Sequence, residues 1–485
     1  MQSPTISLRE FDTFGDVAAE DDPVLEYFLS TNAVESIRKN ESFLVLGRKG
    51  TGKTAIVRHF TETGGSTSKA LSLRGYPWNV HAQRIDGGAS DIEAYVSSWR
   101  YLIAVELASL VLKQEGAWQS GLVGSLDNFL KENYGGSSPK LEDILRPKRL
   151  KLNKISFMPS VMGNQLGGVD LERNSSDHQF GLELNALTSA IMDAVRDALS
   201  WSKAESLSLH FDELDQGITV LDDSRERMII GLIIAAREIK RESEKSGKPI
   251  NPVVYLRSDI WEELNFSDKN KISQTLTHIL EWNSGTLLDL IEARIRAKLG
   301  PSASWDKIIE PELMRGSQPK WNHILSRTFL RPRDVIRFLN GALKEAKKRG
   351  VEPILLSNKD IVGSREDYSS YLKAELDDEI RPHWQHWGEA LQACSAISTI
   401  TFEKNDFERE YKARTSRGNK INTEEALSLL YRFSVIAYPT RSGYGGSGWV
   451  FQYIDQHSGW DSGAKNFKVH LGLKEYAKLR EARST

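Results

Sequence analysis

Nine consecutive residues, 47–55, have the types and spacing of a phosphate-binding loop. They are Gly47, Arg48, Lys49, Gly50, Thr51, Gly52, Lys53, Thr54 and Ala55, and the first eight fit the pattern G-x-x-x-x-G-K-[ST] at every fixed position. Glycine carries no Cβ and tolerates positive φ, so such a loop can wrap closely around an anion. The lysine supplies a positive charge at the β- and γ-phosphates, and the threonine hydroxyl is a ligand for Mg²⁺. The loop therefore predicts a site for ATP and Mg²⁺.

The residues around this loop have the patterns of the elements that such a loop needs. Residues 43–46 form a short apolar run, which is typical of a buried strand, and residues 55–60 have the pattern of a first helical turn. A helix that begins at the end of the loop directs unpaired N–H groups and a positive dipole end at the anion.

A second segment ends in two adjacent carboxylates. Residues 207–211 are mostly apolar and are followed by Asp212 and Glu213, which is the Walker B form of strand end. We expect this strand to lie beside the loop strand of a doubly wound parallel sheet, with its carboxyl end facing the same crevice. Asp212 is then the candidate Mg²⁺ ligand and Glu213 the candidate general base for the attacking water. Asp215 is a weaker candidate, with capping of the following turn as its alternative role.

Two further groups of polar residues are candidates for sensing the γ-phosphate. Residues 252–256 read as a buried strand that ends at Arg257 and Ser258, and an arginine can hold a phosphate through two hydrogen bonds. Arg331 and Arg333 flank Pro332 at the predicted start of a helix, from which they are candidates to reach the nucleotide. For all three arginines, an ion pair or surface charge is the alternative.

Composition limits the class of protein. The chain has 485 residues, 39% hydrophobic and 27% charged, with a net charge of −2, so any nucleic-acid contact must come from a local basic patch. Cys394 is the only cysteine, which excludes internal disulfides and fits a reducing cytoplasm. The longest apolar stretch, 101–112, is interrupted by Glu106 and is too short to span a bilayer, so we expect a cytoplasmic protein with no membrane contact.

We expect four parts along the chain. They are an N-terminal segment (1–25), a P-loop core (26–300) with an inserted hairpin at about 145–178, a helical lid (301–365) and a winged-helix-like domain (366–485). A long helix over 92–113 carries Trp99 in an apolar stripe, which favours a core position over a platform for stacking bases.

The C-terminal part has a helix followed by two strands. A helix over 423–433, capped by Thr423, precedes strands at 434–438 and 449–453, and this order suggests a winged helix. A basic cluster precedes the helix, and the turn between the strands adds one more cation; the members are Lys404, Arg409, Lys412, Arg414, Arg417, Lys420 and Arg441. Such a cluster can follow the backbone of double-stranded DNA, but acidic residues dilute it and protein contact is the alternative.

Taken together, these motifs resemble ASCE-class P-loop ATPases. The likeness is to AAA+ ATPases of the origin-recognition type and to STAND signalling ATPases, and it covers roughly residues 25–365. The matching segments are GRKGTGKT at 47–54, LHFDELD at 209–215, VVYLRSD at 253–259, ILEWNSGTLLDLIEARI at 279–295 and RPRD at 331–334. The resemblance implies an α/β core with a helical lid and a C-terminal winged helix, and binding and hydrolysis of Mg-ATP with a nucleotide-driven change between core and lid. We also expect a homo-oligomer. Some such bacterial proteins are linked to anti-phage defence.

Three functions are consistent with these observations. The first is an ATPase whose nucleotide state controls binding to DNA or to an effector protein. The second is a STAND-like scaffold that assembles on ATP binding with little turnover, and the third is a DNA-remodelling motor. Glu213 favours real turnover of ATP. The motifs contain no distinct arginine finger. Arg294 and Arg296 are the candidates for that role.

Overall fold

The computed structural model describes residues 6–74, 76, 92–145, 177–214, 222–245, 247–441, 447–455 and 458–481. The chain divides into two compact units, and each unit has its own hydrophobic core. The sheet unit consists of Ser30–Arg48 and Lys53–Leu280, and the helical unit consists of Met1–Leu29, Lys49–Gly52 and Glu281–Thr485. The predicted hairpin at about 145–178 lies almost wholly outside the described residues, and the four-part division stays a prediction.

In the part of the chain that the structure describes, the sheet unit has five parallel strands in the order β2-β3-β4-β1-β5. Their bounds are β1 (Leu44–Leu46), β2 (Ser68–Ser72), β3 (Leu207–Asp212), β4 (Ile250–Leu256) and β5 (Thr277–Ile279). Every residue of β1 and of β4 is buried, as expected for central strands covered on both faces. With the loop at the carboxyl end of β1, this is the α/β P-loop NTPase fold.

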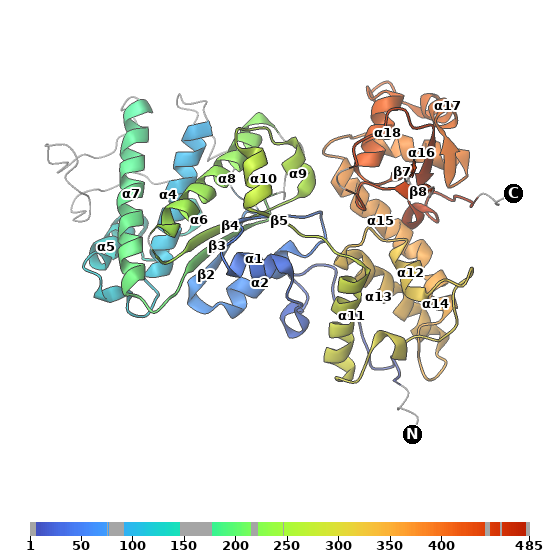
Figure 1. Cartoon of the computed structure of the whole chain (residues 1–485), viewed down its shortest axis with the longest axis horizontal. Helices are drawn as coiled ribbons and strands as arrows, with labels where there is room; N and C mark the ends of the chain where they lie inside the picture. The colour runs from blue at the N-terminus through green and yellow to red at the C-terminus, as the bar shows by residue number, and fades with distance from the viewer. Residues whose placement is uncertain are drawn as a thin grey trace. The chain divides into compact units, whose positions relative to one another are not determined.

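Helices cover both faces of the sheet. Figure 1 shows α1 and α2 on one face and α4 and α8 on the other. The bounds are α1 (Asn32–Arg38), α2 (Lys53–Thr63), α4 (Ile92–Val111), α7 (Asp177–Trp201) and α8 (Asp223–Glu244), with α5 (Val123–Tyr134), α6 (Leu141–Leu145), α9 (Ser258–Glu263) and α10 (Lys269–Thr275) completing the unit.

One expectation about the sheet was wrong. Strand β3, which ends in Asp212, does not pair with β1; β4 lies between them, with Phe211 opposite Val254 and Val254 opposite Leu44. The physical reason is the path of the chain. After β1 it crosses through α2 to the far edge of the sheet, and β3 and β4 then fill the space back toward β1.

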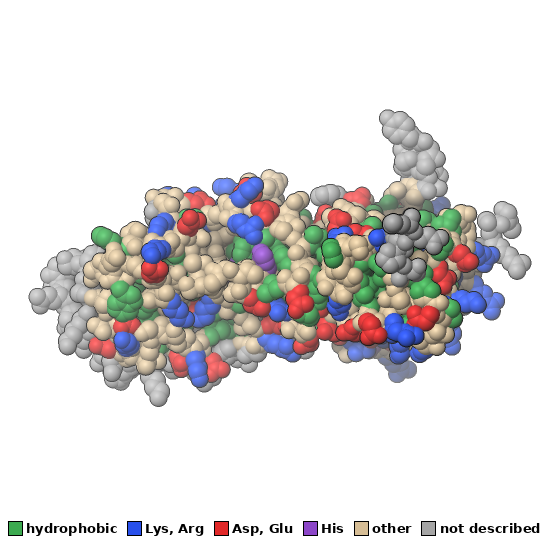
Figure 2. Space-filling model, turned by 90° about the horizontal axis from the view of Figure 1, so that it is seen from below, with side chains coloured by type: hydrophobic (Ala, Val, Ile, Leu, Met, Phe, Trp, Pro, Cys, Tyr) green, Lys and Arg blue, Asp and Glu red, His purple; other side chains and the backbone are tan. Residues whose placement is uncertain are grey.

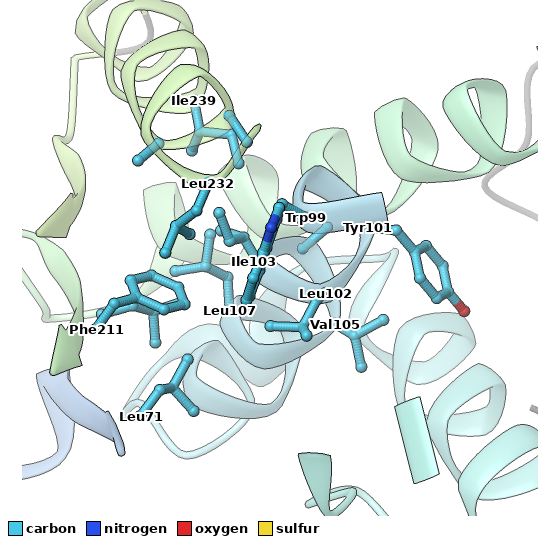
Figure 3. Close-up of a cluster of buried hydrophobic side chains, with 14 of the residues drawn as sticks. Leu71, Trp99, Tyr101, Leu102, Ile103, Val105, Leu107, Phe211, Leu232 and Ile239 are labelled. Atoms are coloured by element: carbon cyan, nitrogen blue, oxygen red, sulfur yellow. The ribbon is translucent and has the colours of Figure 1, made fainter. Parts of the chain in front are cut away.

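Trp99 belongs to the core, as predicted. Its side chain is completely buried, its indole N–H donates to the Met228 carbonyl at 2.9 Å, and its ring lies edge-on to Phe211 with centroids 6.2 Å apart. Figure 3 shows it among Leu102, Ile103 and Leu232. Such burial leaves no ring face for a nucleic-acid base.

The helical unit consists mainly of helices and contains a small antiparallel sheet. The helices are α11 (Ser284–Leu299), α12 (Lys320–Leu325), α13 (Pro332–Arg349), α14 (Asn358–Gly363), α15 (Arg365–Ile380), α16 (Trp387–Ile397), α17 (Lys404–Arg414) and α18 (Thr423–Arg432). The strands are β6 (Thr401–Glu403), β7 (Ile436–Arg441), β8 (Ser447–Val450) and β9 (Asn466–Val469), in the order β6-β9-β7-β8.

The predicted helix-then-hairpin order is present in this unit. Helix α18 is followed by β7 and β8, which pair antiparallel with Tyr438 opposite Val450. The N-cap of α18 is Asn422 rather than Thr423, because Asn422 and Glu425 form a reciprocal capping box. Assignment of these elements to a winged helix stays a prediction.

Among the described residues, no helix is both long and apolar enough to cross a membrane. On the face shown in Figure 2, basic and acidic side chains are interspersed, in keeping with the nearly balanced charge of the chain.

Candidate functional site

The phosphate-binding loop joins β1 directly to α2. Helix α2 begins at Lys53, so the loop ends at the amino end of a helix, where N–H groups lack helical partners. Gly50 and Gly52 have φ values of +81° and +99°, a region that side chains with a Cβ rarely adopt. At Gly52 a Cβ would meet no heavy atom within 4 Å, so glycine is required there by conformation and not by space.

Lys53 lies against the loop that precedes it. Its ammonium group donates to the carbonyl oxygens of Gly47 at 2.9 Å and of Arg48 at 3.1 Å. These contacts hold the charge over the loop, where the β- and γ-phosphates are expected.

Thr54 and Asp212 come together, although they lie on separate elements. The Thr54 hydroxyl donates to the Asp212 carboxylate, and the backbone N–H of Glu213 donates to it as well. Asp212 is only 6% exposed, and this burial raises its pKa to about 6, while the Thr54 hydroxyl, the Glu213 backbone N–H and the charge of Lys53 act in the opposite direction. A buried carboxylate beside a hydroxyl is an oxygen donor set that suits Mg²⁺. The residues present therefore fit the metal that the loop implies.

Glu213 has a strained backbone and a specific partner. Its φ of +61° is in the left-handed region, which costs a residue with a Cβ on the order of 1 kcal/mol. The hydroxyl of Ser72 donates to its carboxylate. Ser72 is the last residue of β2 and lies opposite Asp212 in the parallel register, so the strand pairing brings serine and glutamate together. Sequence reasoning missed Ser72, because only the strand order shows that β2 neighbours β3.

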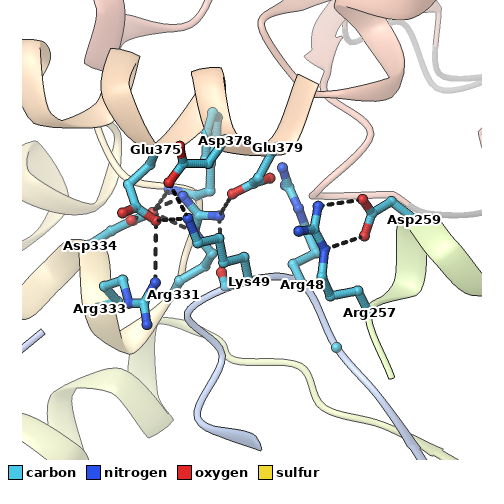
Figure 4. Close-up of polar contacts among 12 residues, drawn as sticks. Arg48, Lys49, Arg257, Asp259, Arg331, Arg333, Asp334, Glu375, Asp378 and Glu379 are labelled. Atoms are coloured by element: carbon cyan, nitrogen blue, oxygen red, sulfur yellow. Dashed lines mark hydrogen bonds and ion pairs between the residues drawn. The ribbon is translucent and has the colours of Figure 1, made fainter. Parts of the chain in front are cut away.

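The two sensor candidates after β4 differ in their surroundings. The Arg257 guanidinium forms a two-point ion pair with Asp259, with Nε–Oδ1 at 3.0 Å and Nη2–Oδ2 at 2.5 Å, which Figure 4 shows. The Ser258 hydroxyl oxygen is buried and has no hydrogen-bond partner among the described residues. An unsatisfied buried hydroxyl is costly, so Ser258 is the candidate with an unused hydrogen-bonding group.

Three consecutive residues of the loop, which belong to the helical unit, have carbonyl oxygens that accept hydrogen bonds from other residues of that unit. Lys49 O accepts from Arg331 Nη1 at 3.0 Å, Gly50 O from the backbone N–H of Arg333 at 3.4 Å, and Thr51 O from the Trp282 indole at 2.9 Å. In a peptide group the N–H is directed opposite to the C=O. Fixing these carbonyls therefore directs the following amides toward the other side of the loop, where an anion can accept from them. Trp282 was not predicted as a site residue.

Arg331 is fully committed to protein partners. It is 1% exposed and pairs with Asp334, with Nε–Oδ2 at 2.9 Å, and with Glu379, with Nη1–Oε1 at 2.5 Å. The two carboxylates raise the pKa of Arg331 above its usual range, against the opposite effect of burial. The guanidinium thus acts on the loop backbone through the Lys49 carbonyl.

Two other cations meet the acidic side of α15. Arg333 donates from Nε to the Val17 carbonyl at 2.9 Å, and its Nη1 lies 3.3 Å from Glu375. The Lys49 ammonium lies 2.8 Å from Asp378 and 3.4 Å from Glu375. Figure 4 shows Lys49 and Arg333 converging on these carboxylates, and Arg331 beside them with Asp334 and Glu379. Arg331 and Arg333 therefore form ion pairs within the protein, which was the alternative to contact with the nucleotide.

The candidate arginine fingers have local roles. Arg294 is 4% exposed, pairs with Asp22 at 2.8 Å and donates to the Phe14 carbonyl at 2.9 Å, whereas Arg296 pairs with Glu292 on its own helix at 2.8 Å. Arg294 is therefore a structural residue of the helical unit and does not reach outward.

Comparison with known proteins gives one family match and distant relatives. Residues 285–377 match FunZ_C, the FunZ-associated C-terminal helical domain. The putative transposon gamma-delta 80.3 kDa protein of Escherichia coli K12 is 24% identical over 423 residues, covering 83% of this chain; the chain spans only 55% of that relative.

Two solved structures align over most of the chain but at low similarity. They are the Aeropyrum pernix Orc1 protein in complex with DNA (11% identity, 93% of this chain and 91% of that one, TM-score 0.36) and Cdc6p of Pyrobaculum aerophilum (14% identity, 94% and 96%, TM-score 0.29). At these scores the alignments carry no argument about the site.

Replacing Arg331 with methionine tests the buried network. Arg331→Met leaves Asp334 and Glu379 buried without their cation, so we expect a loss of about 3–5 kcal/mol in the free energy of unfolding. The control is Arg337→Met on the same helix, whose pair with Asp367 is exposed to solvent and should contribute less than about 1 kcal/mol. Equal losses in chemical denaturation of the two variants would show that Arg331 has no special role.

Replacing Ser72 with alanine tests the positioning of Glu213. For the ATPase that the loop and Glu213 predict, we expect kcat to fall by about tenfold or more, with KM nearly unchanged, because the acid loses its orienting hydroxyl while the phosphate contacts remain. Ser68→Ala, at the opposite end of β2, is the matched control. A Ser72→Ala enzyme with unchanged kcat would contradict this role.

Proposed function

We propose that this chain binds Mg-ATP and hydrolyses it, with residues 47–55 holding the phosphates. The observation that carries the proposal is the hydrogen bond from Thr54, at the first turn after the loop, to the buried carboxylate of Asp212. Two separate motifs thereby supply oxygen atoms to one point beside the phosphate loop. Mg²⁺, when bound there by Thr54 and Asp212, supplies neutralisation of phosphate charge.

The chain's own residues have distinct tasks in this proposal. Loop amides and the Lys53 ammonium hold the phosphates and stabilise the charge that develops on them. Glu213, oriented by Ser72, accepts a proton from the attacking water. Arg257 and Ser258 follow β4 at the same edge of the sheet, and we assign them to sensing the γ-phosphate, with Ser258 offering its unused hydroxyl.

We further propose that a nucleotide at the loop affects the helical unit, of which Lys49–Gly52 are part. Three carbonyl oxygens of the loop accept hydrogen bonds from Trp282 and from residues at the start of α13. One of these donors, Arg331, also forms an ion pair with Glu379 on α15. A phosphate that changes the loop conformation must change these hydrogen bonds. Arg331 and Arg333 thus act on the loop backbone in this proposal, in place of direct contact with the nucleotide.

DNA is the proposed partner of the helical unit. The E. coli relative is named as a transposon protein, which is consistent with a DNA-linked role. In α17, however, Arg409, Lys412 and Arg414 are each paired with an acidic residue of the same helix. In the described part of the cluster, Arg417 and Lys420 have no ion pair, and we assign the phosphate contacts to them. The homo-oligomer and the link to anti-phage defence stay predictions.

A signalling scaffold that assembles on ATP binding with little turnover is the second candidate. The buried Arg331 network favours it, because it ties the loop to α13 and α15 without requiring hydrolysis. Measuring turnover together with molar mass in ATP separates the two functions.

Replacement of Glu213 and of Lys53 tests the proposed enzyme. Glu213→Gln should retain Mg-ATP affinity but lose about 100-fold or more in kcat, since the base is removed and the phosphate contacts remain. Lys53→Ala should abolish measurable binding in calorimetry. Normal hydrolysis by Glu213→Gln would contradict its assignment, and slow wild-type turnover with ATP-dependent assembly would favour the scaffold.

Removal of the unpaired cations tests the DNA assignment. The double variant Arg417→Gln/Lys420→Gln should weaken binding of a double-stranded DNA and reduce the slope of log K against log salt by about 1 to 2. Lys412→Gln is the control, because Lys412 is paired with Glu408. Equal effects of the double variant and the control, in anisotropy titrations, would refute the assignment.

A further inference from the structure

Two arginine side chains and one histidine ring lie together in the helical unit, away from the phosphate loop. His323 belongs to α12, Arg327 follows that helix, and Arg365 is the first residue of α15. Arg327 Nη1 donates to the His323 carbonyl oxygen at 3.1 Å, and Arg365 Nη2 lies within hydrogen-bond distance of His323 Nε2. We call these three residues the His323 cluster.

The imidazole of the His323 cluster is neutral. Its Nδ1 lies 3.1 Å from the amide oxygen of Gln318, which can only accept, so Nδ1 carries the proton and Nε2 accepts from Arg365. Burial, and then the charges of Arg327 and Arg365, lower the pKa of His323 to about 3. The ring therefore adds no positive charge of its own at neutral pH.

The two arginines lack the carboxylate partner that buried arginines usually have. Within the described residues, neither guanidinium forms an ion pair, although Arg327 is only 5% exposed. The Nε atoms of both are buried without an acceptor. Burial and the charge of Arg365 lower the pKa of Arg327 to about 10. Burying a cation without a counter-ion costs free energy, so the cluster lacks an anion that would offset this cost.

The charges around the cluster leave an excess of cations. Glu475 and Glu481 act on the arginines from beyond ion-pair distance, and Glu481 is itself paired with Lys474 and influenced by Arg315. The described groups that act on one another here are five cations (Arg315, Arg327, Arg365, Lys468 and Lys474) and two carboxylates. Cations therefore outnumber carboxylates around the cluster.

We propose that the His323 cluster is a binding site for a phosphate dianion. Guanidinium groups donate in pairs to tetrahedral oxyanions, and two of them side by side provide more donors than the protein uses here. An excess of cations favours inorganic phosphate or a phosphomonoester, which carry nearly two negative charges at neutral pH, over a phosphodiester with one. Arg365 and Lys474 are only partly buried and give the ligand access.

Thermal unfolding of the full chain in phosphate and in chloride tests this site. The measurements use the Lys53→Ala background, so that phosphate in the nucleotide loop does not contribute, and both buffers have the same ionic strength at pH 7.5. At phosphate concentrations about tenfold above Kd, we expect Tm to rise by about 3–6 °C relative to chloride. Titration calorimetry with inorganic phosphate and with glycerol 3-phosphate then shows whether the free ion or the monoester binds more tightly.

Arg365→Gln gives the decisive comparison. In chloride its Tm should be equal to or above that of the background, because the repulsion between two arginines is relieved, and the phosphate-dependent rise should be lost. Lys344→Gln on α13 removes one exposed positive charge and should keep the rise. Lys474→Gln, at the accessible side, should weaken phosphate binding several-fold.

Three results would overturn the proposal. One is the absence of any phosphate-dependent rise in the Lys53→Ala background. Another is an undiminished rise in Arg365→Gln, and the third is an equal loss of stability by Arg365→Gln in both buffers, which would assign the arginine a purely structural role. All three are independent of whether the wild-type chain binds Mg-ATP.

Discussion

The hydrogen bond between Thr54 and Asp212 is the interaction on which the rest of this site depends. It joins the first turn of α2 to the end of β3, two elements separated by more than 150 positions in the chain. The parallel sheet makes it possible, because all five strands present their carboxyl ends at one edge. Burial favours a protonated Asp212. The Thr54 hydroxyl, the Glu213 backbone N–H and Lys53 oppose this effect and favour the ionised carboxylate, which can bind a cation.

A second constraint acts on the backbone of the loop itself. Two glycines in left-handed conformations give the loop its curvature, and three donors of the helical unit hold its carbonyls. One of these donors, Arg331, is buried with Asp334 and Glu379, an arrangement whose desolvation cost is offset only while every partner is present. The loop conformation and the positions of α13 and α15 are therefore linked through a network in which the loss of any one partner is destabilising.

Sequence reasoning identified the contiguous parts of this structure. The loop, the strands before and after it, Asp212 and the α/β fold were predictable, because each depends on residues that are neighbours in the chain. The position of β3 beside β2 and β4 was not predictable from local pattern, and Ser72 was missed for the same reason. Trp282 and the carboxylate partners of Arg331 and Arg333 were also missed, since a sequence shows a cation but does not show which distant acid neutralises it.

The dependence of ATP affinity on Mg²⁺ tests the central claim most directly. Calorimetric titration of the wild-type chain with ATP should show tighter binding with Mg²⁺ than with EDTA, and Asp212→Asn should lose most of that difference while keeping its affinity for metal-free ATP. If Asp212→Asn retains the full Mg²⁺ dependence, or if the wild-type chain binds no ATP under either condition, the assignment of this edge of the sheet to a metal-nucleotide site is contradicted.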